Sequence, residues 1–153
     1  MTASDIVSCL TARGQTLCCA ESLTGGLISD AIVRIPGASR VFLGGVVSYA
    51  EEVKQQLLGV SAQTLLAHTA VSAQTACEMA QGVRSLLQAD YAVSATGYAG
   101  PDGDDVGLVY IGYADAAVCE SRAFRFSGDR AEIRLQSVKA ALDVLAAHLN
   151  HCK

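Results

Sequence analysis

The sequence TLCCAESLTGG, at residues 16–26, sets the expected fold. Its first five residues favour a strand, and a glycine pair then loosens the chain before a helix-like run over residues 27–34. A strand, a turn and a helix in this order begin a parallel α/β unit. Ser22 lies in the turn, beside backbone N–H groups that neither element pairs, which is where α/β folds place their ligands. The turn therefore predicts a nucleophile that shares its site with an oxyanion or a phosphate.

The composition is that of one compact domain. The chain has 153 residues, of which 51% are apolar and 17% charged, which is enough for a hydrophobic core. Its net charge is −4 and no basic cluster would follow a phosphate backbone, so we expect no nucleic acid as a partner. No run approaches the roughly 18 apolar residues of a membrane span, and the first residues lack a signal-peptide pattern. We therefore expect one cytoplasmic domain over residues 1–153 with no membrane contact.

Six cysteines are spread along the chain, and we expect them to be small, buried apolar side chains. They form no CxxC pair, and no histidine lies at zinc-ligand spacing from two of them, so we expect no metal. Cys18 and Cys19 are adjacent on the predicted strand, so their side chains should point to opposite faces of the sheet and not pair. The six are Cys9, Cys18, Cys19, Cys77, Cys119 and Cys152.

The rest of the chain alternates predicted helices and strands. A helix over 4–13 precedes the first strand, and a continuous apolar run over 41–49 predicts a mostly buried second strand beside it. The further elements are helices over 50–58, 61–68 and 72–87, a strand over 90–96, a glycine-rich loop over 97–105, strands over 106–114 and 118–126, and a helix from residue 128 on. The last two strands predict an antiparallel hairpin. We expect a three-layer α/β/α sandwich on a mixed, mostly parallel five-stranded sheet.

Polar residues gather at the ends of three predicted strands. Ser22 follows the first strand, and Tyr49 ends the second with Lys54 shortly beyond it. Thr96 and Gly97 end the third. Because ligands of open α/β sheets bind beyond the carboxyl ends of strands, these residues are expected around one pocket. The pocket predicts a small polar or phosphorylated ligand, and its serine makes hydrolysis a candidate reaction.

Each candidate has a structural alternative. A serine such as Ser22 at the start of a helix is commonly an N-cap, whereas the glycines beside it favour a nucleophile. Lys54 suits the general base better than the three histidines, none of which follows a strand facing Ser22; its alternative is an exposed lysine on an amphipathic helix. Tyr49 either orients the pair or packs in the core. If the catalytic interpretation holds, the Lys54 amine lies within hydrogen-bond reach of the Ser22 hydroxyl.

At these residues the sequence resembles the carboxy-terminal domain of the competence/damage-inducible CinA proteins, and the stand-alone amidohydrolases of that family that act on nicotinamide mononucleotide. The matching stretches follow one another in order along nearly the whole chain, and the set is more specific than any single motif. They are AESLTGG (20–26), PGAS (36–39), FLGGVVSYAEEVKQQLLGV (42–60), AVS (70–72), EMAQGVR (78–84), ATGYAGP (95–101), VGLVYIG (106–112) and FRFSGDR (124–130).

The resemblance implies an α/β/α fold, a homo-oligomer and the deamidation of nicotinamide mononucleotide to nicotinate mononucleotide and ammonia, without a metal or cofactor. This reaction belongs to pyridine-nucleotide salvage. The resemblance assigns Ser22 as the nucleophile, Lys54 as the base and Tyr49 as the residue that assists them. The residues that it places around the small-molecule nucleotide substrate are Thr24, Gly25 and Gly26 on one side and Thr96, Gly97 and Gly100 on the opposite wall.

One segment departs from the family pattern. After Pro101, relatives carry a longer glycine-rich segment, roughly GPxGGTxxKPVG, whereas this chain has DGDD at residues 102–105. Aspartates there would repel a phosphate if they faced the site. The departure leaves an alternative open, in which the protein is a catalytically weak or inactive paralogue that keeps the fold for ligand binding or assembly. A damage-response interaction module, a third candidate, has no feature in the sequence that points to it.

Overall fold

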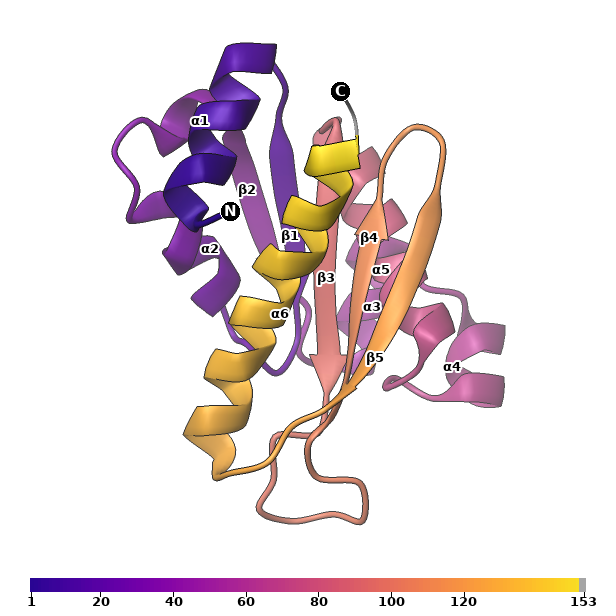
Figure 1. The fold of residues 1–153 in the computed structure, drawn as a ribbon. Coiled ribbons are helices and arrows are strands. Elements are labelled where there is room, and N and C mark those ends of the chain that lie inside the picture. Colours follow the sequence, from indigo (N-terminus) through magenta and orange to yellow (C-terminus); the bar gives the residue numbers. More distant parts are fainter. Residues whose placement is uncertain (152–153) are drawn as a thin grey trace.

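The computed structural model describes residues 1–151, in which a five-stranded sheet lies between two layers of helices (Figure 1). The strands are β1 (Leu17–Glu21), β2 (Phe42–Val47), β3 (Tyr91–Gly97), β4 (Leu108–Ala114) and β5 (Cys119–Arg125), and their order across the sheet is β2-β1-β3-β4-β5. β1 pairs in parallel with β2 and β3, whereas β4 is antiparallel to both β3 and β5. The predicted α/β/α sandwich with a mixed sheet is confirmed, although over these residues parallel and antiparallel pairings are equally frequent.

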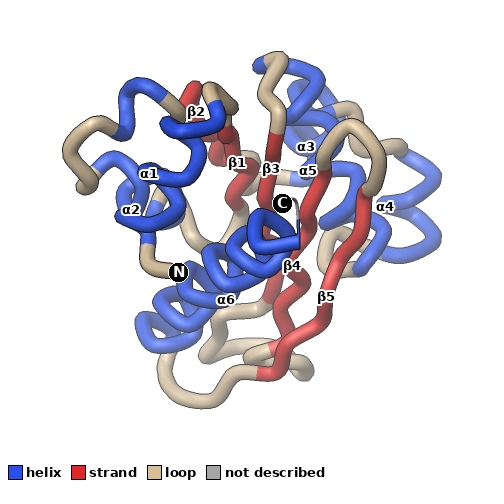
Figure 2. Tube along the Cα trace, turned by 45° about the horizontal axis from the view of Figure 1, so that its top comes forward, coloured by secondary structure: helices blue, strands red, loops and turns tan. Residues whose placement is uncertain are grey.

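Helices cover both faces of the sheet (Figure 1; Figure 2). One face carries α1 (Ala3–Arg13), α2 (Leu27–Val33) and α6 (Arg130–His151); the other carries α3 (Glu51–Leu58), α4 (Ala62–His68) and α5 (Ala73–Leu87). A short 3-10 helix, Ala38–Arg40, leads into β2. The predicted helices and strands are all present. Wherever the sequence predicted a first or last residue, the observed bound differs from it by two residues or fewer. Within the described part of the chain, none of the helices combines the length and apolar character that crossing a membrane requires.

The two sides of the sheet have separate hydrophobic clusters. Cys19 belongs to the cluster beneath α1, α2 and α6, and Cys18 belongs to the cluster beneath α3 and α5. The neighbouring cysteines therefore point to opposite faces, as the strand prediction requires, and both are free and buried. Burial raises the pKa of the Cys18 thiol to about 12, so this side chain stays protonated and acts as a small apolar group.

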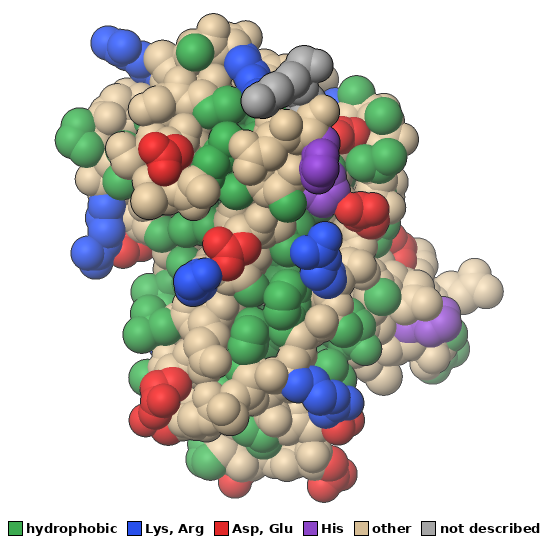
Figure 3. Space-filling view, viewed as in Figure 1, with side chains coloured by type: hydrophobic (Ala, Val, Ile, Leu, Met, Phe, Trp, Pro, Cys, Tyr) green, Lys and Arg blue, Asp and Glu red, His purple; other side chains and the backbone are tan. Residues whose placement is uncertain are grey.

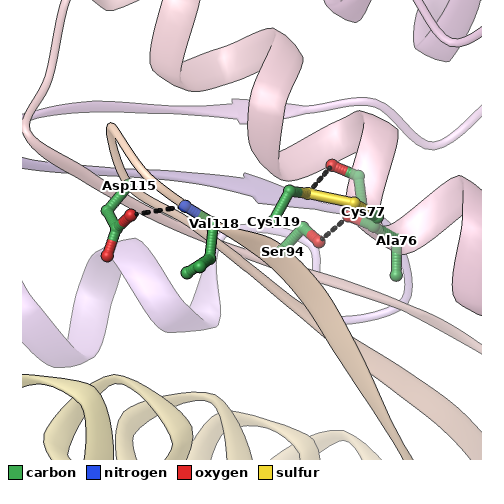
Figure 4. Close-up of a disulfide and its surroundings, with 6 residues drawn as sticks. All are labelled: Ala76, Cys77, Ser94, Asp115, Val118 and Cys119. Atoms are coloured by element: carbon green, nitrogen blue, oxygen red, sulfur yellow. Dashed lines mark hydrogen bonds between the residues drawn. A yellow bond between two sulfur atoms is a disulfide. The ribbon is translucent and has the colours of Figure 1, made fainter.

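A disulfide joins Cys77 of α5 to Cys119 of β5, so the expectation of six unpaired cysteines is wrong (Figure 4). The two Cα atoms are 5.8 Å apart although 42 residues separate them in sequence. In the same turn of α5, the Ala76 carbonyl accepts a hydrogen bond of 2.6 Å from the Ser94 hydroxyl of β3. Local spacing does not reveal the pair, because only the packing of α5 across the sheet brings the two cysteines together. Cys152 lies outside the described residues.

β2 is more exposed than its continuous apolar run predicts. It pairs only with β1 and forms an edge of the sheet. Leu43 and Val47 are consequently 47% and 48% exposed. The prediction of a mostly buried strand is wrong because an edge strand has a neighbour on one side only.

Gly82 of α5 marks a close approach to α3, the helix that carries Lys54. A β-carbon at Gly82 would lie 1.8 Å from the carbonyl oxygen of Leu58, the last residue of α3. Leu58 packs in the cluster beneath α3 and α5. The missing side chain thus sets the distance between the two helices.

We predict that Gly82→Ala destabilises the protein. In an open helix, this change stabilises by about 1 kcal/mol, but overpacking against the Leu58 carbonyl reverses the sign and costs about 1–3 kcal/mol. Urea unfolding measures the difference in the free energy of unfolding. Ser85→Ala, on an exposed position of the same helix, is the matched control, with a change within about 0.5 kcal/mol. Equal or greater stability of Gly82→Ala would contradict the close approach.

Candidate active site

The carboxyl ends of the parallel strands β1, β2 and β3 lie side by side at one end of the sheet. Backbone hydrogen bonds between these segments continue for one residue beyond the strands. The Ser22 amide donates to the Ala95 carbonyl at 3.0 Å, and the Ser48 amide donates to the Glu21 carbonyl at 2.8 Å. A cavity of about 270 Å³ opens at this end of the sheet. Its lining residues include Ser22, Leu23, Tyr49, Lys54, Thr96 and Arg130.

Lys54 reaches Ser22 from α3 and is almost fully buried, with 1% of its surface exposed. Its Nζ donates to the Ser22 Oγ at 2.9 Å, to the Ser48 carbonyl at 2.6 Å and to the Tyr49 carbonyl at 3.2 Å. The expected contact between amine and hydroxyl is confirmed. The two structural alternatives are wrong, because Lys54 is not exposed and the N-cap of α2 is Gly26 rather than Ser22.

The three contacts of Lys54 couple its protonation to the hydroxyl of Ser22. An ammonium has three N–H groups, which match the three acceptors. A neutral amine has two N–H groups and a lone pair, so one partner must donate to it. Carbonyl oxygens cannot donate, so the Ser22 hydroxyl is the partner that turns its proton toward Nζ. Deprotonation of Lys54 therefore converts this contact into a pair of base and nucleophile.

The pKa of Lys54 lies near neutrality. Burial lowers the pKa of this amine from 10.5 to about 8, and the Glu51 carboxylate at the start of the same helix opposes the shift. With a pKa near 8, roughly a tenth of the protein has a neutral Lys54 at pH 7, and about nine tenths at pH 9. A lysine in this range can serve as a general base.

Glu21 precedes Ser22 in the chain and is fully buried. Its side chain fixes the start of α2. Its carboxylate accepts hydrogen bonds from the amides of Ile28 (2.8 Å) and Ser29 (3.0 Å) and from the Ser29 hydroxyl (2.8 Å). The helix dipole favours a negative charge at this position. The amino-terminal donors of α2 are thus occupied by a carboxylate of the protein itself.

The turn after Ser22 keeps amides free for a ligand. Within residues 1–151, the N–H groups of Leu23 and Thr24 have no acceptor, and the hydroxyl of Thr24 is buried without a partner. The Ser22 amide is already bonded to Ala95. Where a serine nucleophile stands at a turn from strand to helix, the amide of the following residue commonly holds the oxyanion. Leu23 follows Ser22 and lines the cavity, so its free amide is in the corresponding position.

Tyr49 and Arg130 lie together at the cavity. The Tyr49 side chain is 65% exposed, which rules out core packing, and its hydroxyl accepts from Arg130 Nη2 at 3.3 Å. Tyr49 meets Lys54 through its carbonyl rather than its phenol. Arg130 Nη1 also donates to the Gly100 carbonyl at 2.6 Å. The sequence analysis missed Arg130 as a site residue, although it closes the matching stretch at 124–130.

The remaining predicted site residues take different positions. Thr96 and Gly97 line the cavity, and the Thr96 hydroxyl donates to the carbonyl of Ala70 at 2.7 Å. Ala70 and Val71, which also line the cavity, were missed because they lie in a connection between helices. The predicted residues that do not line the cavity within the described chain are Thr24, Gly25, Gly26 and Gly100.

The aspartates of the shortened loop do not face the cavity. Asp102, Asp104 and Asp105 are exposed, and the residues that line the cavity do not include them. Asp105 lies 3.8 Å from Arg125 of β5. The loop projects beyond the sheet in Figure 1, and Figure 3 shows acidic and basic side chains interspersed on the same face of the molecule. Their charges are therefore directed to solvent rather than to a bound ligand.

Comparison with known proteins places the chain among CinA proteins. The family model described as the CinA C-terminal domain matches residues 1–149. A CinA-like protein of Endomicrobium trichonymphae is 50% identical over 139 residues, which cover 88% of this chain and 32% of that protein. The chain thus spans about a third of the length of the curated relatives that it matches.

Solved structures match over nearly the full length of both chains. A CinA superfamily protein from Klebsiella pneumoniae has a TM-score of 0.93 and 34% identity, with 97% of this chain and 96% of that chain covered. The competence/damage inducible protein CihA from Agrobacterium tumefaciens has a TM-score of 0.93 and 40% identity, with 97% and 93% covered. At these identities, the likeness extends beyond the fold to the sequence.

We predict that a fluorophosphonate probe labels Ser22 and that the rate follows the neutral form of Lys54. The rate should rise with pH through a midpoint near 8 and level off above it, because only the neutral amine takes the serine proton. Lys54→Met should slow labelling by about 10²-fold or more. Peptide mass spectrometry locates the label, and Lys139→Met, at an exposed position of α6, should keep the normal rate. Labelling at another serine, or a rate that is flat from pH 6 to 10, would contradict the pairing.

Proposed function

The chain belongs to the CinA C-terminal domain family, and from that premise we propose that it is an amidohydrolase that deamidates nicotinamide mononucleotide. The products are nicotinate mononucleotide and ammonia, as in pyridine-nucleotide salvage. The observation that carries the proposal is the 2.9 Å contact between the buried Lys54 Nζ and the Ser22 Oγ. Amide hydrolysis requires a nucleophile, a base that later protonates the leaving nitrogen, and donors for the oxyanion.

In the first half of the reaction, Ser22 is acylated. Neutral Lys54 takes the hydroxyl proton while Oγ bonds to the carboxamide carbon, and the carbonyl electron pair moves onto oxygen. The free amide of Leu23, which lines the cavity, holds that oxyanion. When it collapses, the bond from carbon to nitrogen breaks, and the Lys54 ammonium protonates the leaving nitrogen. Ammonia departs and an ester to Ser22 remains.

In the second half, water releases the acid. Lys54, neutral again, takes a proton from water as the water oxygen bonds to the ester carbon. Collapse of the second oxyanion breaks the bond to Ser22 Oγ, which receives the proton held by Lys54. The net change is amide plus water to carboxylic acid plus ammonia, and the enzyme returns to its starting state.

The size and charge of the cavity support a nucleotide with its amide ring inside. The volume of about 270 Å³ is below the roughly 300–1,000 Å³ of sites that enclose a drug-sized ligand, so it suits one ring with the rest of the molecule at the mouth. Arg130 lines this cavity. Of the five N–H groups of a guanidinium, its bonds to Gly100 and Tyr49 use two, which leaves donors for a phosphate.

The alternative function, ligand binding by a catalytically weak paralogue, rests on the short acidic loop. Its aspartates are exposed and outside the cavity lining, so repulsion of a bound phosphate is small. The two candidates differ in turnover. A weak paralogue would raise its melting temperature with the nucleotide but release no ammonia.

We predict ammonia release from nicotinamide mononucleotide by the purified protein. Ser22→Ala and Lys54→Met should each lower kcat by about 10³-fold or more, because nucleophile and base act as one unit. The wild-type kcat should rise with pH through about 8, the pKa of Lys54. Ser39→Ala, at an exposed position, is the control for Ser22→Ala. Full activity in Ser22→Ala would exclude the proposed mechanism.

We also predict that Arg130→Met weakens recognition of the phosphate. Loss of charge-assisted hydrogen bonds worth about 1.5–3 kcal/mol should raise KM for nicotinamide mononucleotide by roughly 10- to 100-fold. Nicotinamide riboside, which lacks the phosphate, is the matched control substrate, and its KM should change little. An equal increase for both substrates would show that Arg130 only shapes the cavity.

A further inference from the structure

Arg134 of α6 donates hydrogen bonds to the backbone of the turn that carries Ser22. Its Nε donates to the Leu23 carbonyl at 2.9 Å, and its Nη2 donates to the Thr24 carbonyl at 3.3 Å. A β-carbon at Gly25 would lie 3.2 Å from the same Nη2, and Gly25 has a φ of +56°, so a glycine there lets the guanidinium pack directly on the turn. The side chain is partly buried and crosses from a helix 111 residues away in sequence.

These two hydrogen bonds influence the directions in which the amides of the turn point. A trans peptide is planar, so its N–H points opposite to its carbonyl. Because the Leu23 carbonyl points to Arg134, the N–H of Thr24 points away from α6. The Thr24 carbonyl, which accepts from Arg134 Nη2, sets the direction of the Gly25 N–H. That N–H donates to the Ser22 carbonyl at 3.1 Å, and the Ser22–Leu23 peptide in turn sets the direction of the Leu23 N–H.

Arg134 and Lys54 approach the turn from helices on opposite faces of the sheet. α6 and α3 lie on opposite faces of the sheet (Figure 2), and Lys54 of α3 reaches Ser22 from its own side. The nucleophile turn is therefore held by Arg134 on one side, while Ser22 meets its base on the other. Within residues 1–151, the Leu23 carbonyl has no hydrogen-bond donor other than Arg134.

We propose that Arg134 is a positioning residue for the oxyanion site. By holding the Leu23 and Thr24 carbonyls, it orients the peptide units that follow them. Through the bond from the Gly25 amide to the Ser22 carbonyl, it keeps the amide of Leu23, which lines the cavity, on the side of the turn where Ser22 reacts. Arg134 holds the two carbonyls with two different atoms of a rigid planar group, Nε and Nη2. A lysine has all its N–H groups on one atom at the end of a flexible chain, so it does not reproduce this geometry. The inference rests on the proposed acyl transfer to Ser22, but not on the identity of the amide.

The test measures two reactions of the same variants. The first is labelling of Ser22 by a fluorophosphonate, whose phosphoryl oxygen takes the place of the oxyanion and needs no nucleotide recognition. The second is the release of ammonia from nicotinamide mononucleotide. We compare Arg134→Met and Arg134→Lys with wild type and with Lys139→Met, a control on an exposed position of the same helix. Melting temperatures verify that each variant is folded.

For Arg134→Met we expect the labelling rate and kcat to fall by about 10- to 100-fold, since loss of one oxyanion donor costs up to about 10³-fold. KM should stay within about twofold, and the pH midpoint should remain near 8, because Lys54 and Ser22 keep their contact. Arg134→Lys should recover little of either rate. In Arg134→Ala, added guanidinium should restore part of the labelling rate, which also covers the case in which the methionine variant does not fold.

Three results would overturn the proposal. One is a normal labelling rate in folded Arg134→Met. Another is a slow labelling reaction whose pH midpoint has shifted toward 10.5. That result would mean that Arg134 acts by keeping Lys54 buried and not by orienting the amides of the turn. The third is full recovery in Arg134→Lys. If wild type is labelled at Ser22 but releases no ammonia, the proposed substrate fails, and the labelling series still decides the role of Arg134.

Discussion

Burial of the Lys54 amine is the constraint on which the site depends. An ammonium removed from water is unstable unless each N–H finds an acceptor, and here Ser22 and the carbonyls of Ser48 and Tyr49 provide the three. The carbonyls follow directly on β2, so the strand fixes them. The remaining desolvation appears as the fall in pKa from 10.5 to about 8, roughly 3 kcal/mol between the charged and neutral forms. Burial of this one amine thus sets how readily Lys54 gives up its proton.

Contacts between β2, β1 and α2 hold the turn that carries Ser22. Gly45 of β2 has no side chain at a point where a β-carbon would lie 2.2 Å from the Ser29 hydroxyl. This space lets Ser29 bond the carboxylate of Glu21, which in turn fixes the start of α2 and the turn that holds Ser22. The positions of β2, β1 and α2 therefore depend on one another. A larger residue at position 45 would displace Ser22 without touching it.

The sequence sufficed for those parts of the site that follow strand ends. Ser22 and Lys54 are 32 residues apart, but both come after neighbouring parallel strands, and the rule that such ends share one edge of the sheet brings them together. Arg134 and the disulfide between Cys77 and Cys119 depend instead on how a helix lies across the sheet. No local pattern encodes that placement. Glu21 escaped notice for a related reason, since its residue type is common on surfaces and only the fold shows it buried against α2.

The lowered pKa of Lys54 exists only in the folded chain. Leu58 and Val60, at the end of α3, pack with Met79 and Val83 of α5, so the helix that carries Lys54 is held by a later segment. In a solvated chain, the pKa of a lysine is near 10.5, and at pH 7 about three amines in ten thousand are neutral. In the fold, with a pKa of about 8, roughly one in ten is neutral. Folding therefore raises the population of the neutral amine by a few hundredfold, and the same packing that stabilises the sandwich places this amine against the Ser22 hydroxyl.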